Sequence, residues 1–290
     1  MNDNNAAIRR KGYFLTILGV LWMSPDALLL RLIDSHALEI IGWRAGLTAL
    51  VLLMYLYWRD GRALFAKMLA QGSGLLIVTA LYSINSVSFV SSIVYAGVAD
   101  ALVIIASTPL WAALFSYLIL REILSVRTAL AIFLGAVGVF ITASGGLNGG
   151  SALGMAFALA TSISLAIQFT LLRKWEIVDP VAGIFLGSIV TCCIAFAFSD
   201  PMSIQGEARF WAIILGLFLS PIAFTLVSIG PKYIPSAEVS LIMFLETLLG
   251  PLWVWMALGE EPSRTALIGG AIILLGVGIT TISAFQGKTA

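Results

Sequence analysis

The chain has few of the residues with which a soluble protein covers its surface. Only 11% of its 290 residues are charged and 60% are hydrophobic, whereas an ordinary globular domain carries about 25% charged residues. The net charge is +1 and one histidine is present, so a basic surface for nucleic acid is absent from the sequence. The composition therefore indicates a membrane protein and no nucleic-acid partner.

Catalytic and metal-binding patterns are also scarce. The single histidine, His36, falls in an expected loop, and the sequence contains no HExxH or GxSxG motif. Cys192 and Cys193 are adjacent within one apolar segment, where neighbouring residues rarely form a disulfide. None of the expected spans carries a lysine of the kind a retinal protein needs. We expect no enzyme activity, no metal and no cofactor.

Long apolar stretches, by contrast, fill most of the chain. A membrane span needs roughly 20 predominantly apolar residues. The sequence predicts ten such helices, at 12–30, 38–58, 73–94, 101–120, 125–144, 152–172, 180–198, 210–231, 237–258 and 264–284. The first stretch follows three cations, as a signal peptide would, but it is long and no small-residue cleavage site follows it. We therefore expect a retained helix and a single, all-α membrane domain over 1–290.

The cationic residues give this map an orientation. If the N-terminus faces the cytoplasm, twelve cations fall on the inner side and three on the outer side, while Arg44 lies within the second helix. This bias follows the positive-inside rule and predicts that both termini are cytoplasmic. The inner set is Arg9, Arg10, Lys11, Arg59, Arg62, Lys67, Arg121, Arg127, Arg173, Lys174, Lys232 and Lys288, and the outer set is Arg31, Arg209 and Arg264.

Two halves of the sequence resemble each other. A shift of 138 residues places Tyr95 on Tyr233, Asp100 on Glu238 and Glu122 on Glu260. Near the start, a shift of 142 aligns the first and sixth helices better. Each half, about 12–144 and 152–284, holds five helices. Because five is odd, the second half would enter the membrane from the opposite side, which predicts an inverted repeat and a substrate site between the halves.

Several residues resemble those of the drug/metabolite transporter superfamily, in its ten-helix branch of two EamA-type repeats. They are an early tryptophan, Trp22; an arginine in the second helix, Arg44; Pro109 followed by Glu122; and Leu245-Glu246-Thr247 followed by Glu260. Thr247 departs from the Leu-Glu-Pro that is typical of the second repeat, which suggests a straighter ninth helix. The sequence looks most like the YddG group of aromatic amino acid exporters. This resemblance implies a central cavity lined by helices one, three, four, six, eight and nine.

Charged side chains inside membrane spans are costly and need a reason. Asp26, Arg44 and Glu246 are such residues. Asp26 follows Pro25 and, at the shift of 142, coincides with Gln168, so it is a candidate for substrate binding or proton exchange. Arg44 and Glu246 are candidates for structural or coupling roles. Helix packing is the alternative for all three.

Polar and aromatic residues at helical spacing complete the candidate site. Hydroxyls and amides could bind the charged ends of an amino acid while rings cover its side chain, although Ser and Thr also bond neighbouring helices together. The candidate substrate-binding residues are Trp22, Asp26, Tyr82, Asn85, Ser86, Phe89, Ser107, Trp111, Thr161, Ser164 and Gln168.

These features predict a bacterial inner-membrane exporter of small metabolites, most simply amino acids. A sugar phosphate or nucleotide sugar would need several buried cations, and Arg44 stands alone. Proton-coupled export of hydrophobic cations is the alternative, with an acidic residue exchanging the proton and rings contacting the cation. Besides the substrate and the lipid bilayer no partner is implied, and because one chain holds both halves a monomer is sufficient.

Overall fold

Helices make up every regular element of the structure, a computed structural model that describes residues 3–144, 151–259 and 264–285. In a bilayer each backbone N–H and C=O needs a partner within the protein, and helices supply it locally. Eight helical stretches are long and apolar enough to cross a membrane. The prediction of an all-helical membrane protein is therefore confirmed for the described residues.

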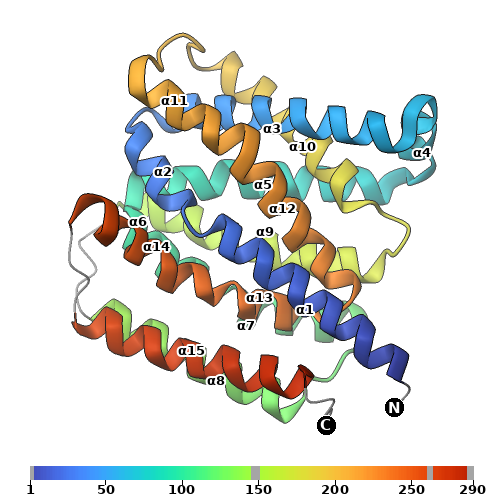
Figure 1. The fold of residues 1–290 in the computed structure, drawn as a ribbon, viewed down its shortest axis with the longest axis vertical. Coiled ribbons are helices and arrows are strands. Elements are labelled where there is room, and N and C mark those ends of the chain that lie inside the picture. Colours follow the sequence, from blue (N-terminus) through green and yellow to red (C-terminus); the bar gives the residue numbers. More distant parts are fainter. Residues whose placement is uncertain (1–2, 145–150, 260–263, 286–290) are drawn as a thin grey trace.

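The eight stretches comprise continuous helices and interrupted ones (Figure 1). The continuous ones are α3 (Ala37–Asp60), which leads through a 3-10 turn (Gly61–Ala63) into α4 (Leu64–Ala70), α5 (Gly72–Ala96), α9 (Ala152–Lys174) and α10 (Pro180–Ala197). The interrupted ones are α1 (Asp3–Met23) with α2 (Asp26–Ile33), α6 (Val98–Ile105) with α7 (Thr108–Phe115), α11 (Gly206–Ile214) with α12 (Ser220–Ile229), and α13 (Ser236–Ile242) with α14 (Phe244–Leu258).

Two further helices, α8 (Val126–Ser144) and α15 (Arg264–Phe285), occupy the positions predicted for the fifth and tenth spans. Their apolar parts are shorter, 126–141 and 268–279. A count of ten crossings thus stays a prediction. The predicted loop at 145–150 and Glu260 lie outside the described residues.

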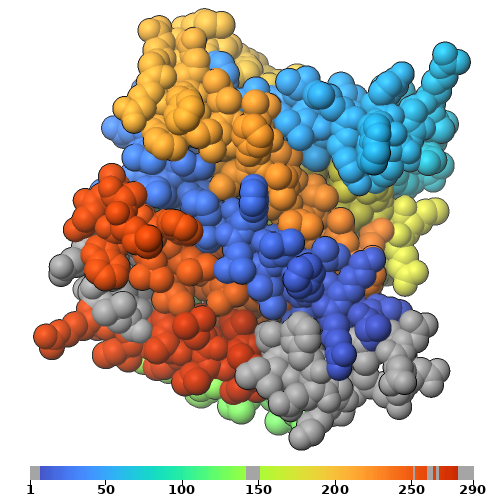
Figure 2. Space-filling view, in the orientation of Figure 1, coloured from blue at the N-terminus to red at the C-terminus, as the bar shows by residue number. Residues whose placement is uncertain are grey.

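Helix pairs form the two opposite edges of the molecule. In Figure 1 α3 and α10 lie along one edge and α8 and α15 along the other, with α1, α5, α9 and α12 between them. Small residues allow the α8–α15 contact: a Cβ on Gly138 would lie 2.6 Å from the Gly269 carbonyl oxygen. Figure 2 shows α1 on one face between α12 and the C-terminal helices, where side chains such as Phe14 (61% exposed) face outward. An apolar outer surface of this kind fits contact with lipid.

The interruptions have local causes in the sequence. Pro25 stands at the start of α2, and Pro109 lies in the first turn of α7; proline lacks the N–H that would continue a helix. The third interruption, at Met243, has no proline. Met243 lies 138 residues after Ile105, the last residue of α6, so the shift seen in the sequence also relates two breaks. The ninth span is therefore not straighter than the fourth, as Thr247 had suggested.

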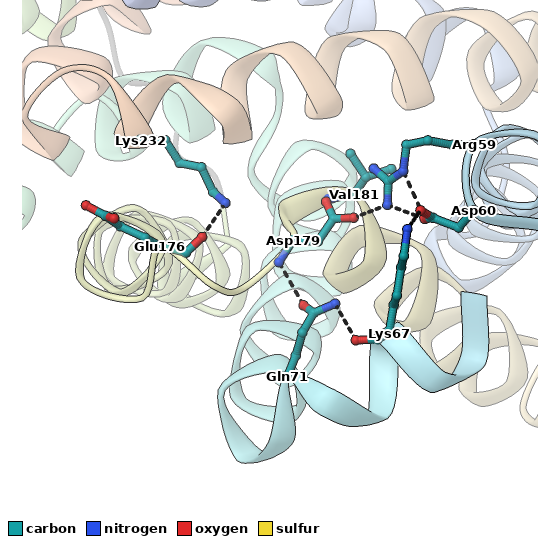
Figure 3. Close-up of polar contacts among 8 residues, drawn as sticks. All are labelled: Arg59, Asp60, Lys67, Gln71, Glu176, Asp179, Val181 and Lys232. Carbon is teal, nitrogen blue, oxygen red and sulfur yellow. Dashed lines mark hydrogen bonds and ion pairs between the residues drawn. The ribbon is translucent and has the colours of Figure 1, made fainter. Parts of the chain in front are cut away.

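An ion-pair cluster joins distant loops at the end of the bundle where α1 begins, which we call the α1 end (Figure 3). Asp60 accepts hydrogen bonds from Arg59 at 2.6 Å and from Lys67 at 2.5 Å, and Arg59 also pairs with Asp179. The Asp179 backbone N–H donates to Gln71 Oε1 at 2.7 Å. The cluster ties the loop after α3 to the start of α10.

Other cations that the sequence places on the inner side contact partners at the same end. Arg173 donates to Glu122 at 2.8 Å, and Lys232 donates to the Glu176 carbonyl at 2.8 Å (Figure 3 shows the second contact). Arg9, on α1, binds Glu238 at 3.1 Å. The helices α1 and α15 also begin and end, respectively, toward this end in Figure 1. The cations thus gather at one end, as the charge distribution predicts.

Candidate functional site

A cavity lies among the interrupted spans. The empty space among its lining side chains, including its open part, is about 510 Å³, within the roughly 300–1,000 Å³ typical of small-molecule sites. Its walls combine rings, amides, hydroxyls and two carboxyl groups. The lining residues are Met23, Asp26, Tyr82, Asn85, Phe89, Ile105, Thr161, Leu165, Gln168, Phe169, Phe224, Val227, Ser228, Met243 and Glu246.

The helix interruptions place residues at this cavity. Met23 and Asp26 flank the α1–α2 break, Ile105 ends α6, and Met243 is the break between α13 and α14. The remaining lining residues come from α5, α9, α12 and the first turn of α14. These are the same six spans that the family resemblance implied. In transporters, discontinuous helices commonly form the substrate site, because their ends supply free backbone groups and helix dipoles.

Arg44 and Asp26 form a buried ion pair beside the cavity. Arg44 Nη2 donates to Asp26 Oδ2 at 2.5 Å, and Arg44 Nε donates to the Ser220 hydroxyl at 3.0 Å. The Arg44 Cζ atom lies 5.3 Å from the ring centroid of Phe89 and 5.0 Å from that of Phe224. Both rings line the cavity and Arg44 does not. Cation–π contact therefore accompanies a pair that takes up the positive charge locally.

Glu246 is in a different position. Its side chain is 3% exposed and lines the cavity, and its Oε1 has no hydrogen-bond partner among the described residues. Asp26 Oδ1 and Gln168 Oε1 are likewise without a partner there. Three acceptor oxygens at one cavity thus lack donors, and unpaired buried acceptors are costly. A ligand that carries N–H donors would relieve this cost.

Of the predicted substrate-binding residues, six line the cavity: Asp26, Tyr82, Asn85, Phe89, Thr161 and Gln168. Five others do not, namely Trp22, Ser86, Ser107, Trp111 and Ser164. Trp22 is 45% exposed and donates to the Phe218 carbonyl. Ser107 binds Ser162 at 2.9 Å and accepts from Trp111 Nε1 at 3.2 Å. Ser164 donates to the Thr161 carbonyl. These side chains bond helices or their own backbone.

The sequence interpretation missed the contribution of α12. Phe224, Val227 and Ser228 lie on one face of this helix by their spacing and reach the cavity. The phenyl ring and hydroxyl four residues apart were a usable signal, although the helix carries no charge to draw attention to it. Phe169, Leu165 and Met243 gave no such signal, because apolar residues fill every span.

Polar contacts close the space between α1, α9 and α13 toward the α1 end. Tyr13 donates to Glu238 Oε2 at 2.8 Å, and the hydroxyls of Ser116 and Ser236 lie 2.5 Å apart. On the other side of the cavity, Trp253 Nε1 donates to Ser24 Oγ at 2.8 Å, which joins α14 to the α1–α2 break. Each contact links an element of the first half of the chain to one of the second.

Metal ligation has no support in the described ranges. No group of three or more His, Cys, Asp or Glu side chains there is placed to hold an ion. The chemistry of the cavity is that of hydrogen bonding, one uncompensated carboxyl group and aromatic contact, which suits a small organic molecule.

Interrupted membrane helices around a polar and aromatic cavity define the class of membrane transporters. The family model of EamA-like transporters matches this chain twice, at residues 10–144 and 152–282. The chain belongs to the EamA-like transporter family of the drug/metabolite transporter superfamily.

Two similar proteins agree with this assignment. An uncharacterised transporter of Archaeoglobus fulgidus is 27% identical over 197 residues, which cover 66% of this chain and 69% of that protein. A solved crystal structure has a TM-score of 0.74 at 20% identity and covers 97% of this chain and 100% of its own. The second likeness concerns the fold alone.

Proposed function

We propose that this transporter exports small amine-bearing metabolites, in the first place neutral and aromatic amino acids, by alternating access through the cavity. One observation carries the proposal: the cavity combines rings (Tyr82, Phe89, Phe224) with the amides of Asn85 and Gln168. Rings bind an apolar side chain, and amides bind both charged ends of a zwitterion without a fixed opposite charge for each.

The proposed architecture has ten spans arranged as two inverted five-helix repeats in one membrane domain. It is supported by the two matches to the family model, by the breaks at Ile105 and Met243 and by the cations at the α1 end. In this proposal the protein resides in the bacterial inner membrane with both termini in the cytoplasm, and it works as a monomer.

Counterflow in proteoliposomes tests the substrate. Vesicles loaded with one unlabelled amino acid are diluted into trace labelled phenylalanine, leucine, alanine or lysine, beside a quaternary ammonium dye. We expect accumulation of labelled phenylalanine and leucine, and a loss with Asn85→Ala but not with Gln205→Ala, whose side chain lies on an exposed loop. Accumulation of the dye alone would overturn the amino acid assignment.

Export of hydrophobic cations is the second candidate, and a specific observation favours it. Glu246 offers a carboxyl group without a partner in a cavity walled by rings, which is the environment that binds organic cations. The dye in the same counterflow experiment measures this candidate directly.

A further inference from the structure

The charged side chains deep in the apolar spans do not balance. Asp26, Arg44 and Glu246 are 0%, 2% and 3% exposed. Arg44 is within 2.5 Å of Asp26 and forms its ion pair with that residue. Glu246 has no ion pair among the described residues. Because a lone carboxylate is expensive in this surrounding, Glu246 needs either a proton or a cation from outside the chain.

The guanidinium of Arg44 is not in a position to serve both acids. Its Nη2 and Nε are bound to Asp26 and Ser220, and the rings of Phe89 and Phe224 lie between this group and the cavity wall. The positive charge therefore stays behind the rings. The cavity itself presents acceptor oxygens and a surplus carboxyl group.

The other titratable groups near α14 face elsewhere. Asp26 and Tyr82 line the same cavity as Glu246. The elements packed against α14 are α1, α2, α6, α13 and α15. Their remaining charged or titratable residues lie toward helix ends or in the Arg9–Tyr13–Glu238 cluster: Asp3, Arg9, Arg10, Lys11, Tyr13, Arg31, Asp100, Glu238 and Arg264. Of these, none lines the cavity.

We propose that Glu246 is a single exchange site that holds either the ammonium group of the substrate or a proton. An entering ammonium forms an ion pair with the Glu246 carboxylate, and the proton that the carboxyl carried leaves to water. When the ammonium departs on the opposite side, a proton from that side binds the carboxylate. One proton thus enters for each substrate molecule exported. An ammonium group also brings three N–H donors for the unpaired oxygens of Asp26 and Gln168.

This inference rests on the proposed function and makes it more specific. The ammonium group becomes the obligatory part of the substrate, and the carboxylate becomes dispensable because the cavity has no cation for it. Phenylethylamine and phenylalanine methyl ester should therefore bind, and N-acetylphenylalanine, which has no positive charge, should not.

Proton release on binding tests the exchange directly. Purified protein in weakly buffered detergent solution is titrated with phenylalanine and phenylethylamine while a pH dye reports released protons and equilibrium dialysis reports binding. Below the pH at which Glu246 is already ionised, we expect close to one proton per bound ligand and an apparent Kd that rises up to tenfold per unit fall in pH. Glu246→Gln should release none and bind at least tenfold more weakly. The matched control Glu39→Gln, a buried acid outside the cavity, should behave as the wild type.

The outcomes separate the two proposals. If the wild type binds neither amino acids nor amines, the proposed function fails, and this inference fails with it. If the wild type binds them at every pH from 5 to 9 without proton release, only the exchange at Glu246 is overturned. Proton release that persists in a Glu246→Gln protein that binds ligand would also overturn it. Should Glu246→Gln not fold, Glu246→Asp keeps the exchangeable carboxyl and should retain the proton release with weaker binding, and its loss of release would count against the proposal.

Discussion

Arg44 donates to Asp26 at 2.5 Å and so connects α3 to the start of α2 at a point where neither side chain reaches solvent. Asp26, which the sequence suggested as a proton-exchanging acid, is thus engaged in an ion pair between helices. The residue suggested for a structural role, Glu246, is the one that faces the cavity without a partner. The physical environment of each carboxyl favours exchanging the two roles.

Removal of one member of this pair should destabilise the protein. Breaking a buried ion pair costs about 3–5 kcal/mol, because the remaining charge is left uncompensated. We expect Asp26→Asn and Arg44→Gln each to lower the midpoint of thermal unfolding in detergent, and the double variant to be more stable than either single one. Asp200→Asn, on an exposed loop, serves as the control. Single variants as stable as the wild type would mean that the pair contributes little.

A ring at the cavity wall should discriminate among substrates. Phe224→Leu removes an aromatic face while keeping an apolar side chain, and stacking is worth about 0.5–1.5 kcal/mol beyond buried area. Binding of phenylalanine should weaken roughly twofold to tenfold relative to leucine. Trp111→Leu should leave this ratio unchanged, since Trp111 lies off the cavity and binds Ser107. Competition assays with both amino acids measure it, and a changed ratio in Trp111→Leu would place the ring at the site.

The orientation can be tested from the two ends of the bundle. In a Cys192- and Cys193-free background, a cysteine at Asp200 should react with an impermeant thiol reagent from the outside of intact cells. One at Arg62, near the ion-pair cluster of the α1 end, should react only after permeabilisation. Both side chains are exposed. The opposite labelling pattern would invert the proposed topology, and labelling of both positions from one side would contradict the number of crossings between them.

The α8–α15 contact should tolerate no added methyl group at Gly138. A Cβ there would lie 2.6 Å from the Gly269 carbonyl oxygen, a backbone atom that does not move freely. Gly138→Ala should destabilise the protein by about 1–3 kcal/mol through overpacking. At Gly278 a Cβ would meet nothing within 4 Å, so Gly278→Ala should be neutral or stabilise slightly, because alanine favours a helix. Thermal unfolding of the two variants side by side measures the difference. Equal effects would show that α8 and α15 are not closely held.

The sequence was sufficient to locate the helices because long apolar stretches have few alternatives in a bilayer. It also indicated the break at Pro25, since proline interrupts a helix by itself. The break at Met243 has no such residue, and its cause lies in how α13 and α14 pack. Only its position, 138 residues after Ile105, points to a relation with the first half.

The candidate site could be predicted only in part, for a related reason. Tyr82, Asn85 and Phe89 share a helix face by spacing alone, and they do reach the cavity. The partner of a charge is not a local property, however. Whether Arg44 pairs with Asp26 or with Glu246 depends on the positions of three separate helices, and a single sequence carries no signal for that choice.

The hydrogen bond from Trp253 to Ser24 has a practical consequence. It ties an indole to the interrupted first span, at a residue between α1 and α2 that must shift if the two halves rock against each other. The emission wavelength of Trp253 thus becomes a native reporter of the transport cycle. The difference spectrum between wild type and Trp253→Phe should move to the red when saturating substrate opens this contact, which gives a label-free way to follow the conformational change in time.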